Sequence, residues 1–211
     1  MNPQIWWLTA RSTGIVAWAV LSLSVVLGLA LSTRALGRRP TPAWLQDLHR
    51  ATGGLSITFT AVHLAALVAD TWVHFDLADV LVPLVSEWRS LPVAAGVVAF
   101  WLLVAVEATS LARRRIGVTL WRRIHAASLL LWALATAHLL TAGTDTGNPW
   151  LAWSVLAITM AVATLVLVRI LRPRRRTRRT RSDRPRRALR RRSGTGSPDM
   201  PRSPTATAET P

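Results

Sequence analysis

The chain has 211 residues, of which 51% are hydrophobic, and its formal net charge is +16. It contains no cysteine, which excludes disulfides, zinc–thiolate sites and iron–sulfur clusters. Long apolar stretches separated by short basic loops indicate one membrane-embedded domain rather than a soluble fold.

Five apolar stretches are long enough to cross a bilayer as helices. They cover approximately residues 13–32, 49–70, 93–112, 121–141 and 150–171. The residues before the first stretch lack the basic region of a signal peptide, so we expect an uncleaved first helix. The predicted fold is an all-α membrane protein with about five transmembrane helices.

Four of the five histidines lie in the second and fourth stretches. His49 and His63 of the second stretch have the spacing i, i+14, and His125 and His138 of the fourth have the spacing i, i+13. An ionisable side chain at membrane depth is costly without a partner. Neutral imidazole is an axial ligand of haem iron, and a haem between two helices takes one histidine from each. Two pairs therefore predict two haems stacked across the membrane, so that the helices form a haem-binding bundle.

Helix geometry supports this pairing fully on the second span and partly on the fourth. Fourteen residues rise about 21 Å and return within about 40° of the same helix face. Thirteen residues rise about 20 Å but fall about 140° short of four turns. An overwound turn or a different approach angle on the fourth span would absorb the difference.

Two other interpretations of the histidines remain open. They could be hydrogen-bonded core residues, or proton- or metal-binding groups of a non-catalytic membrane scaffold or small transporter. A reducible low-spin b-type spectrum would distinguish a haem protein from both.

The segment between the second and third spans, residues 76–91, reads DLADVLVPLVSEWRSL. Its apolar residues fall on one helical face, which predicts an amphipathic segment on the outer surface that covers the outer haem. Pro83 would kink a single helix there.

Short-loop charges predict the orientation. Nine arginines lie in the loops on one side and two on the other. The nine are Arg34, Arg38, Arg39, Arg50, Arg113, Arg114, Arg115, Arg122 and Arg123, and the two are Arg11 and Arg89. The positive-inside rule then predicts a multi-pass protein of the cell membrane, with its N-terminus outside and its C-terminus in the cytoplasm.

This orientation predicts an inner haem between His49 and His125 and an outer haem between His63 and His138. Three arginines stand beside the inner ligands in the sequence, where they could pair with haem propionates. They are Arg50, Arg122 and Arg123. Their role as positive-inside anchors is an equally good explanation, and the two roles are compatible.

The C-terminal segment 172–211 holds 14 Arg and three acidic residues, a net charge of +11. It is also rich in Pro, Ser, Thr and Gly, a composition that cannot bury a core. We therefore predict a haem-binding domain over residues 1–172 and a disordered, Arg-rich cytoplasmic tail over 173–211. The expected partner of this tail is anionic lipid, with recruitment of an acidic donor protein as an alternative and no specific nucleic acid.

The histidine pattern is accompanied by HRATGG at His49–Gly54, WRRIH at Trp121–His125 and AHLLTAGTD at Ala137–Asp145. Over about residues 10–171 the chain resembles the ferric reductase-like transmembrane domain. This domain is shared by ferric reductases, NADPH oxidases and the haem subunit of bacterial methionine sulfoxide reductases. NADPH oxidases show the same unequal spacings of 14 and 13. They also carry a similarly placed arginine, which implies a role for Arg11 near the outer haem.

The resemblance implies two bis-histidine haem b groups and transmembrane electron transfer. Full-length relatives have six spans and continue into flavin- and nicotinamide-binding domains, whereas the composition of the 40 residues after Leu171 is not expected to form such a domain. We therefore expect flavin only on a partner, a cytoplasmic flavoprotein reductase or other electron donor. The extracytoplasmic acceptor implied by the family name is ferric iron; oxygen, quinone and a periplasmic flavoprotein remain open. The chain would be the haem-bearing membrane subunit of an oxidoreductase.

Overall fold

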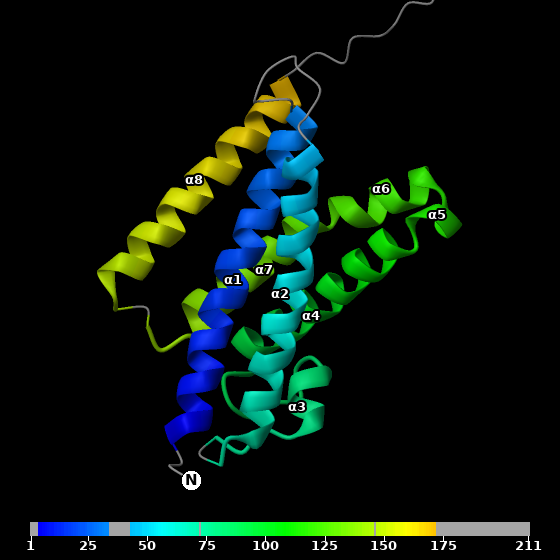
Figure 1. Cartoon of the computed structure of the whole chain (residues 1–211). Coiled ribbons are helices and arrows are strands. Elements are labelled where there is room, and N and C mark those ends of the chain that lie inside the picture. The colour runs from blue at the N-terminus through cyan, green and yellow to red at the C-terminus, as the bar shows by residue number, and fades with distance from the viewer. Residues whose placement is uncertain (1–3, 34–42, 72, 146, 172–211) are drawn as a thin grey trace, which may run out of the picture. The chain divides into compact units, whose positions relative to one another are not determined.

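The computed structural model describes residues 4–33, 43–71, 73–145 and 147–171, which form helices and connecting loops (Figure 1). Within these residues five helical segments are long and apolar enough to cross a membrane. They are α1 (Gln4–Thr33), α2 (Ala43–Ala69), α4 (Ser90–Leu111), the segment Val118–Ala142 and α8 (Pro149–Leu171). The predicted all-α fold with five spans is confirmed. The predicted tail, 173–211, lies outside the described residues.

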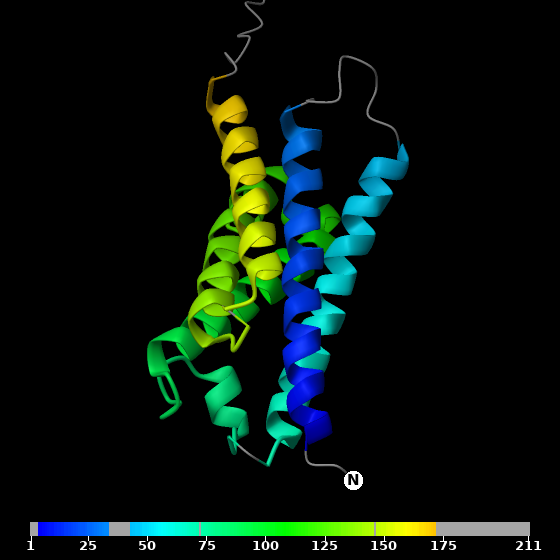
Figure 2. The ribbon, with the colours of Figure 1, turned by 90° about the vertical axis from the view of Figure 1, so that its left-hand side faces the viewer.

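Helix α1 is the centre of the arrangement. It runs antiparallel to α2, and the two lie side by side in both views (Figures 1 and 2). It also contacts α7 (Ser128–Ala142) and α8, while α4 packs against α7. The largest core cluster joins Leu21, Val25 and Leu29 of α1 to Leu131 and Trp132 of α7. Because lipid is as apolar as these side chains, close packing between helices holds such a bundle together.

Buried hydrogen bonds add to the contact between α1 and α7. The indole of Trp18 donates to Thr136 Oγ1 at 3.0 Å, and the indole of Trp132 donates to Ser22 Oγ at 3.0 Å. Polar groups at membrane depth have no water to bind, so each indole needs a protein acceptor. The two bonds run in opposite directions between the helices and fix their mutual register.

The fourth span is two helices, α6 (Val118–Ala126) and α7, which meet at Ala127. The Ala127 N–H donates to the Ile124 carbonyl three residues earlier, at 2.9 Å, so this turn is overwound. In such a turn each residue rotates about the helix axis by about 120° instead of about 100°. Three residues therefore add roughly 60° of rotation. Two of the turn's three steps, from His125 to Ala127, lie between the two histidines and contribute roughly 40°. They account for part of the difference of about 100° between 13- and 14-residue spacings.

The chain reverses between α4 and the fourth span through a short helix, α5 (Arg113–Ile116). Gly117 follows it with φ of 78°, a backbone conformation that glycine adopts without steric cost. This turn brings α6 back against α4.

The predicted amphipathic segment 76–91 is not one helix. It is helical in α3 (Leu77–Leu81), which begins with a capping box between Asp76 and Asp79, and again from Ser90, where α4 begins. Helix α3 stops because Pro83 disfavours the helical conformation of the residue before it, and Val82 is extended. Val80 packs against Val93 and Val97 of α4, so the segment is anchored at this end of the bundle.

Candidate functional site

The four histidines of the second and fourth spans form two pairs. His49 of α2 faces His125 of α6, with ring centroids 6.0 Å apart and ring planes at 82°. His63 of α2 faces His138 of α7, at 6.5 Å and 77°. We refer to them as the inner and outer pairs. Each pair links the second span to the fourth.

The separation of the rings fits haem iron between them. Two imidazoles bound on opposite sides of one metal ion, at about 2 Å each, have ring centroids roughly 6 Å apart. A porphyrin supplies the other four ligands, so two histidines suffice. No cluster of three or more His, Cys, Asp or Glu able to hold a metal ion occurs in the part of the chain that the structure describes.

Three of the four imidazoles have their Nδ1 atom directed at a backbone carbonyl. A carbonyl oxygen can only accept, so Nδ1 carries the proton and Nε2 keeps its lone pair for a metal. The bonds join His49 to Ser24 at 2.9 Å, His63 to Ala10 at 2.6 Å and His138 to Pro92 at 2.8 Å. Helix α1 therefore orients both histidines of α2, and α4 orients His138.

His125 has different surroundings. Its Nδ1 lies 3.4 Å from Ser110 Oγ of α4, and its ring stacks on Trp121 with centroids 5.0 Å apart. The Trp121 indole donates to the same Ser110 hydroxyl at 3.4 Å. The guanidinium of Arg113 lies 4.2 Å from the centre of the Trp121 ring, a cation–π distance. A chain of contacts thus runs from an exposed arginine to the inner pair.

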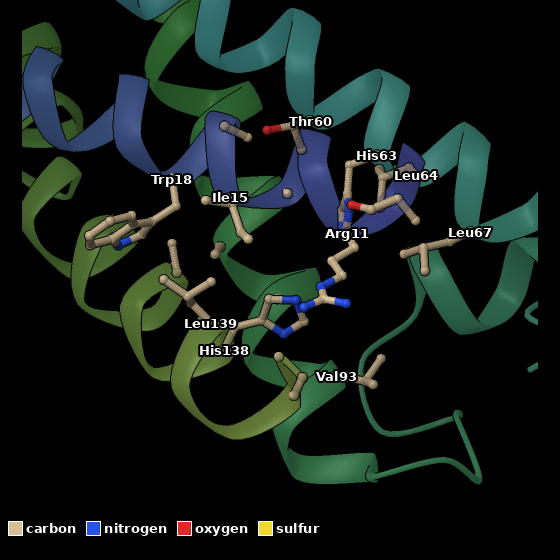
Figure 3. Close-up of a pocket in the computed structure, with 18 of the residues that line it drawn as sticks. Arg11, Ile15, Trp18, Thr60, His63, Leu64, Leu67, Val93, His138 and Leu139 are labelled. Atoms are coloured by element: carbon tan, nitrogen blue, oxygen red, sulfur yellow. The ribbon is translucent and has the colours of Figure 1, made fainter. Parts of the chain in front are cut away.

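The outer pair lies in a cavity of about 240 Å³ whose wall includes Arg11, His63 and His138 (Figure 3). Two nitrogens of the Arg11 guanidinium donate to the two carboxylate oxygens of Asp145, which follows α7. The same guanidinium lies 4.9 Å from the centre of the Trp7 ring. Because the pair is bidentate, Arg11 is held in a defined position at the cavity.

The sequence matches the family model described as "Ferric reductase like transmembrane component" over residues 13–136. The chain belongs to this family. The match contains His49, His63 and His125 and ends shortly before His138. No match was found among curated proteins or among solved structures.

Membership of the ferric reductase-like family, together with the five apolar helices, makes the chain a multi-pass membrane protein. Transmembrane electron transfer is the general activity that the family implies, in association with a redox partner. Ferric reductase-like domains generally bind haem.

In this ferric reductase-like domain the arginines predicted near the inner pair all have exposed side chains. They are Arg50, Arg122 and Arg123. None forms a hydrogen bond or ion pair with another described residue. Arg113, which is not among the arginines predicted there, contacts the inner pair through Trp121.

The sequence hardly indicates that several other residues belong to the site. Asp145 lies in the AHLLTAGTD motif, but nothing in the sequence pairs it with Arg11. Asp70 ends the second apolar stretch and lines the outer cavity with a side chain that is 5% exposed. Its Oδ1 has no hydrogen-bond partner among the residues described. The carbonyls that orient the imidazoles carry no residue-type signal at all.

Proposed function

We propose that the chain carries single electrons across the membrane by holding two haem b groups, one at each histidine pair. Bound there, each haem would supply a reversible one-electron carrier. His49 and His125 would be the axial ligands of the inner haem, and His63 and His138 those of the outer. The observation that carries the proposal is that both pairs have ring separations suited to one iron, with three Nδ1 atoms committed to carbonyls.

The protein's part in this function would be to hold the haems, to orient their ligands and to keep water away from them. Ligation by two histidines leaves no open position on the iron, so electrons would pass to the acceptor without its binding to the metal. The packed helices hold all four histidines half-buried, and within a bilayer they would keep the ligand nitrogens away from bulk water. The ion pair of Arg11 with Asp145 places a charged group at the wall of the outer cavity.

The loop charges give the direction that we propose. By the positive-inside rule, nine arginines on one side would place the inner pair at the cytoplasmic face, the N-terminus outside and the C-terminus inside. A cytoplasmic flavoprotein would be the donor, and an extracytoplasmic species such as ferric iron would be the acceptor. Arg50, Arg122 and Arg123 would anchor this face and pair with propionates of the inner haem, and Arg11 would act near the outer haem. The tail, 173–211, would lie on anionic lipid.

Electron transfer in closed vesicles tests the proposal. Ferricyanide is trapped inside liposomes that contain the haem-loaded protein, and dithionite, which crosses lipid slowly, is added outside. We expect trapped ferricyanide to be reduced much faster than in protein-free liposomes, and His49→Ala protein to return the rate to that background. Equal rates with and without wild-type protein would contradict the proposal.

A further inference from the structure

Three glycines of α1 and α4 lie against three of the histidine rings. A Cβ added at Gly14 would lie 3.0 Å from the His63 ring, and one added at Gly28 would lie 3.1 Å from the His49 ring. At Gly96 the added Cβ would lie 2.7 Å from the ring of His138, closer than a real Cβ contact. The His138 ring therefore occupies space that only a glycine leaves open, and an added Cβ at Gly14 or Gly28 would require the facing ring to shift by a few tenths of an ångström.

Each glycine lies four residues after the residue whose backbone carbonyl accepts a hydrogen bond from the imidazole that the glycine faces. The couples are Ala10 with Gly14, Ser24 with Gly28, and Pro92 with Gly96. Residues four apart in a helix lie on the same face, one turn above each other. The missing side chain thus opens a path along the helix surface to the carbonyl one turn back. That oxygen has a second lone pair, which accepts the Nδ1–H bond in addition to the helical one.

Helix α1 repeats this arrangement at the spacing of the α2 histidines. Gly14 and Gly28 have the spacing i, i+14, as do Ala10 and Ser24, and so do His49 and His63. Since α1 and α2 run antiparallel, a matched spacing brings the same carbonyl–glycine couple to both rings. The fourth histidine, His125, is surrounded differently. Its Nδ1 lies 3.4 Å from the hydroxyl of Ser110 on α4.

Close helix packing is the usual reason for small residues between transmembrane helices. Close packing explains why a glycine is present at each position. It does not explain why, in all three cases, the residue four positions earlier has a carbonyl that binds the histidine ring. Gly53 and Gly54 of α2 show the contrast. An added Cβ at Gly53 would meet the flexible end of Glu107, and one at Gly54 would meet nothing within 4 Å.

We propose that Gly14, Gly28 and Gly96 are positioning residues that set the orientation of the ligand imidazoles and thereby the redox potential of each haem. The inference rests on the proposed function. A carbonyl that accepts from Nδ1–H makes the imidazole a more basic ligand, which favours ferric over ferrous iron. Moving the ring away from the carbonyl therefore raises the midpoint potential of the haem that it ligates.

The test compares Gly14→Ala, Gly28→Ala and Gly96→Ala with Gly54→Ala, a matched control in open space. Midpoint potentials come from redox titration and the ligand field from electron paramagnetic resonance of the ferric state. The two haems are assigned by their loss in His49→Ala and His63→Ala. We expect Gly28→Ala to raise the potential of the inner haem alone. Gly14→Ala should raise that of the outer haem, Gly96→Ala should raise it further, and Gly54→Ala should change neither.

Unchanged potentials in all three variants, or equal shifts in both haems, would overturn the inference. If one alanine variant fails to accumulate, the other two decide the question, because Gly28 lies against a ligand of the inner haem and Gly14 and Gly96 lie against ligands of the outer haem. A resonance and potential altered only at the haem concerned support the inference, and an unaltered haem overturns it. Wild-type protein without haem would refute the proposed function instead.

Discussion

At the scale of residues, the histidine pairs show which features of the site can be predicted from the sequence. Paired ionisable residues in apolar stretches are rare and costly, so their spacing alone predicts partners. The structure places those partners together, at 6.0 and 6.5 Å between rings. Their hydrogen-bond acceptors could not be predicted, because three are backbone carbonyls. The one available signal was the i, i+14 spacing of Gly14 and Gly28 on the first span, which matches that of the histidines on the second.

The ion pair of Arg11 and Asp145 yields a prediction at this scale. Asp145→Asn removes the counter-charge of Arg11 at the outer cavity, and an uncompensated positive charge favours ferrous iron. We expect the outer haem's midpoint potential to rise by about 20–60 mV, the one-electron equivalent of up to ~1.4 kcal/mol. Arg11 is 37% exposed, so solvent keeps the shift small and added salt reduces it.

Redox titration of both haems at low and high salt measures this shift. Asp47→Asn, at an exposed carboxylate near the start of α2, is the control and should leave the outer haem unchanged. An outer haem whose potential does not move in Asp145→Asn, or moves equally in both variants, would argue against a role for the ion pair.

At the scale of elements, the spans were predictable and the irregular segments only in part. Bilayer thickness sets the length of an apolar helix, so five spans follow from hydropathy. The α3 segment is shorter than its apolar pattern suggests, because Pro83 blocks continuation of the helix. The overwound turn at Ala127 has no proline or glycine to mark it. The turn joins α6 and α7, which both pack against α4, and such long-range contacts carry no local sequence signal.

This turn can be tested by inserting one alanine between Ala127 and Ser128. The insertion gives His125 and His138 the same spacing as the histidines of α2, yet it rotates His138 by about 100° relative to its present position. We expect the outer haem to be lost and the inner haem to remain, which lowers the haem content from two per chain to about one. Haem assay and spectra measure this. The control is an alanine inserted after Gly147, in the loop before α8, which should leave both haems in place.

Retention of two haems with unchanged spectra after the Ala127 insertion would mean that the turn does not set the position of His138. Loss of both haems in the control as well would show that any insertion in this half of the chain is disruptive.

At the scale of the whole molecule, the boundary between the membrane domain and the tail remains a prediction. The five spans already anchor the protein, so the net charge of +11 on the segment 172–211 exceeds what anchoring needs. Each arginine near an anionic leaflet contributes about 1 kcal/mol of attraction. Orientation in the membrane or recruitment of a donor is a better explanation of so many charges.

A chain that ends at Leu171 should therefore insert, bind both haems and keep the absorption spectrum of the full chain. With its native donor, reduction of the inner haem should slow by a fewfold at low salt and less at high salt, where steering is screened. Spectra of the purified proteins and stopped-flow reduction measure the two effects. Haem loss on truncation would place part of the tail within the folded domain.

The central claim is that the four histidines hold two haems in these pairs, and haem analysis of the wild type and the four His→Ala variants tests it most directly. We expect two haems b per chain with a reducible low-spin spectrum. His49→Ala and His125→Ala should lose one and the same haem, and His63→Ala and His138→Ala the other. A colourless, iron-free wild-type protein, or losses that pair His49 with His138, would contradict the claim.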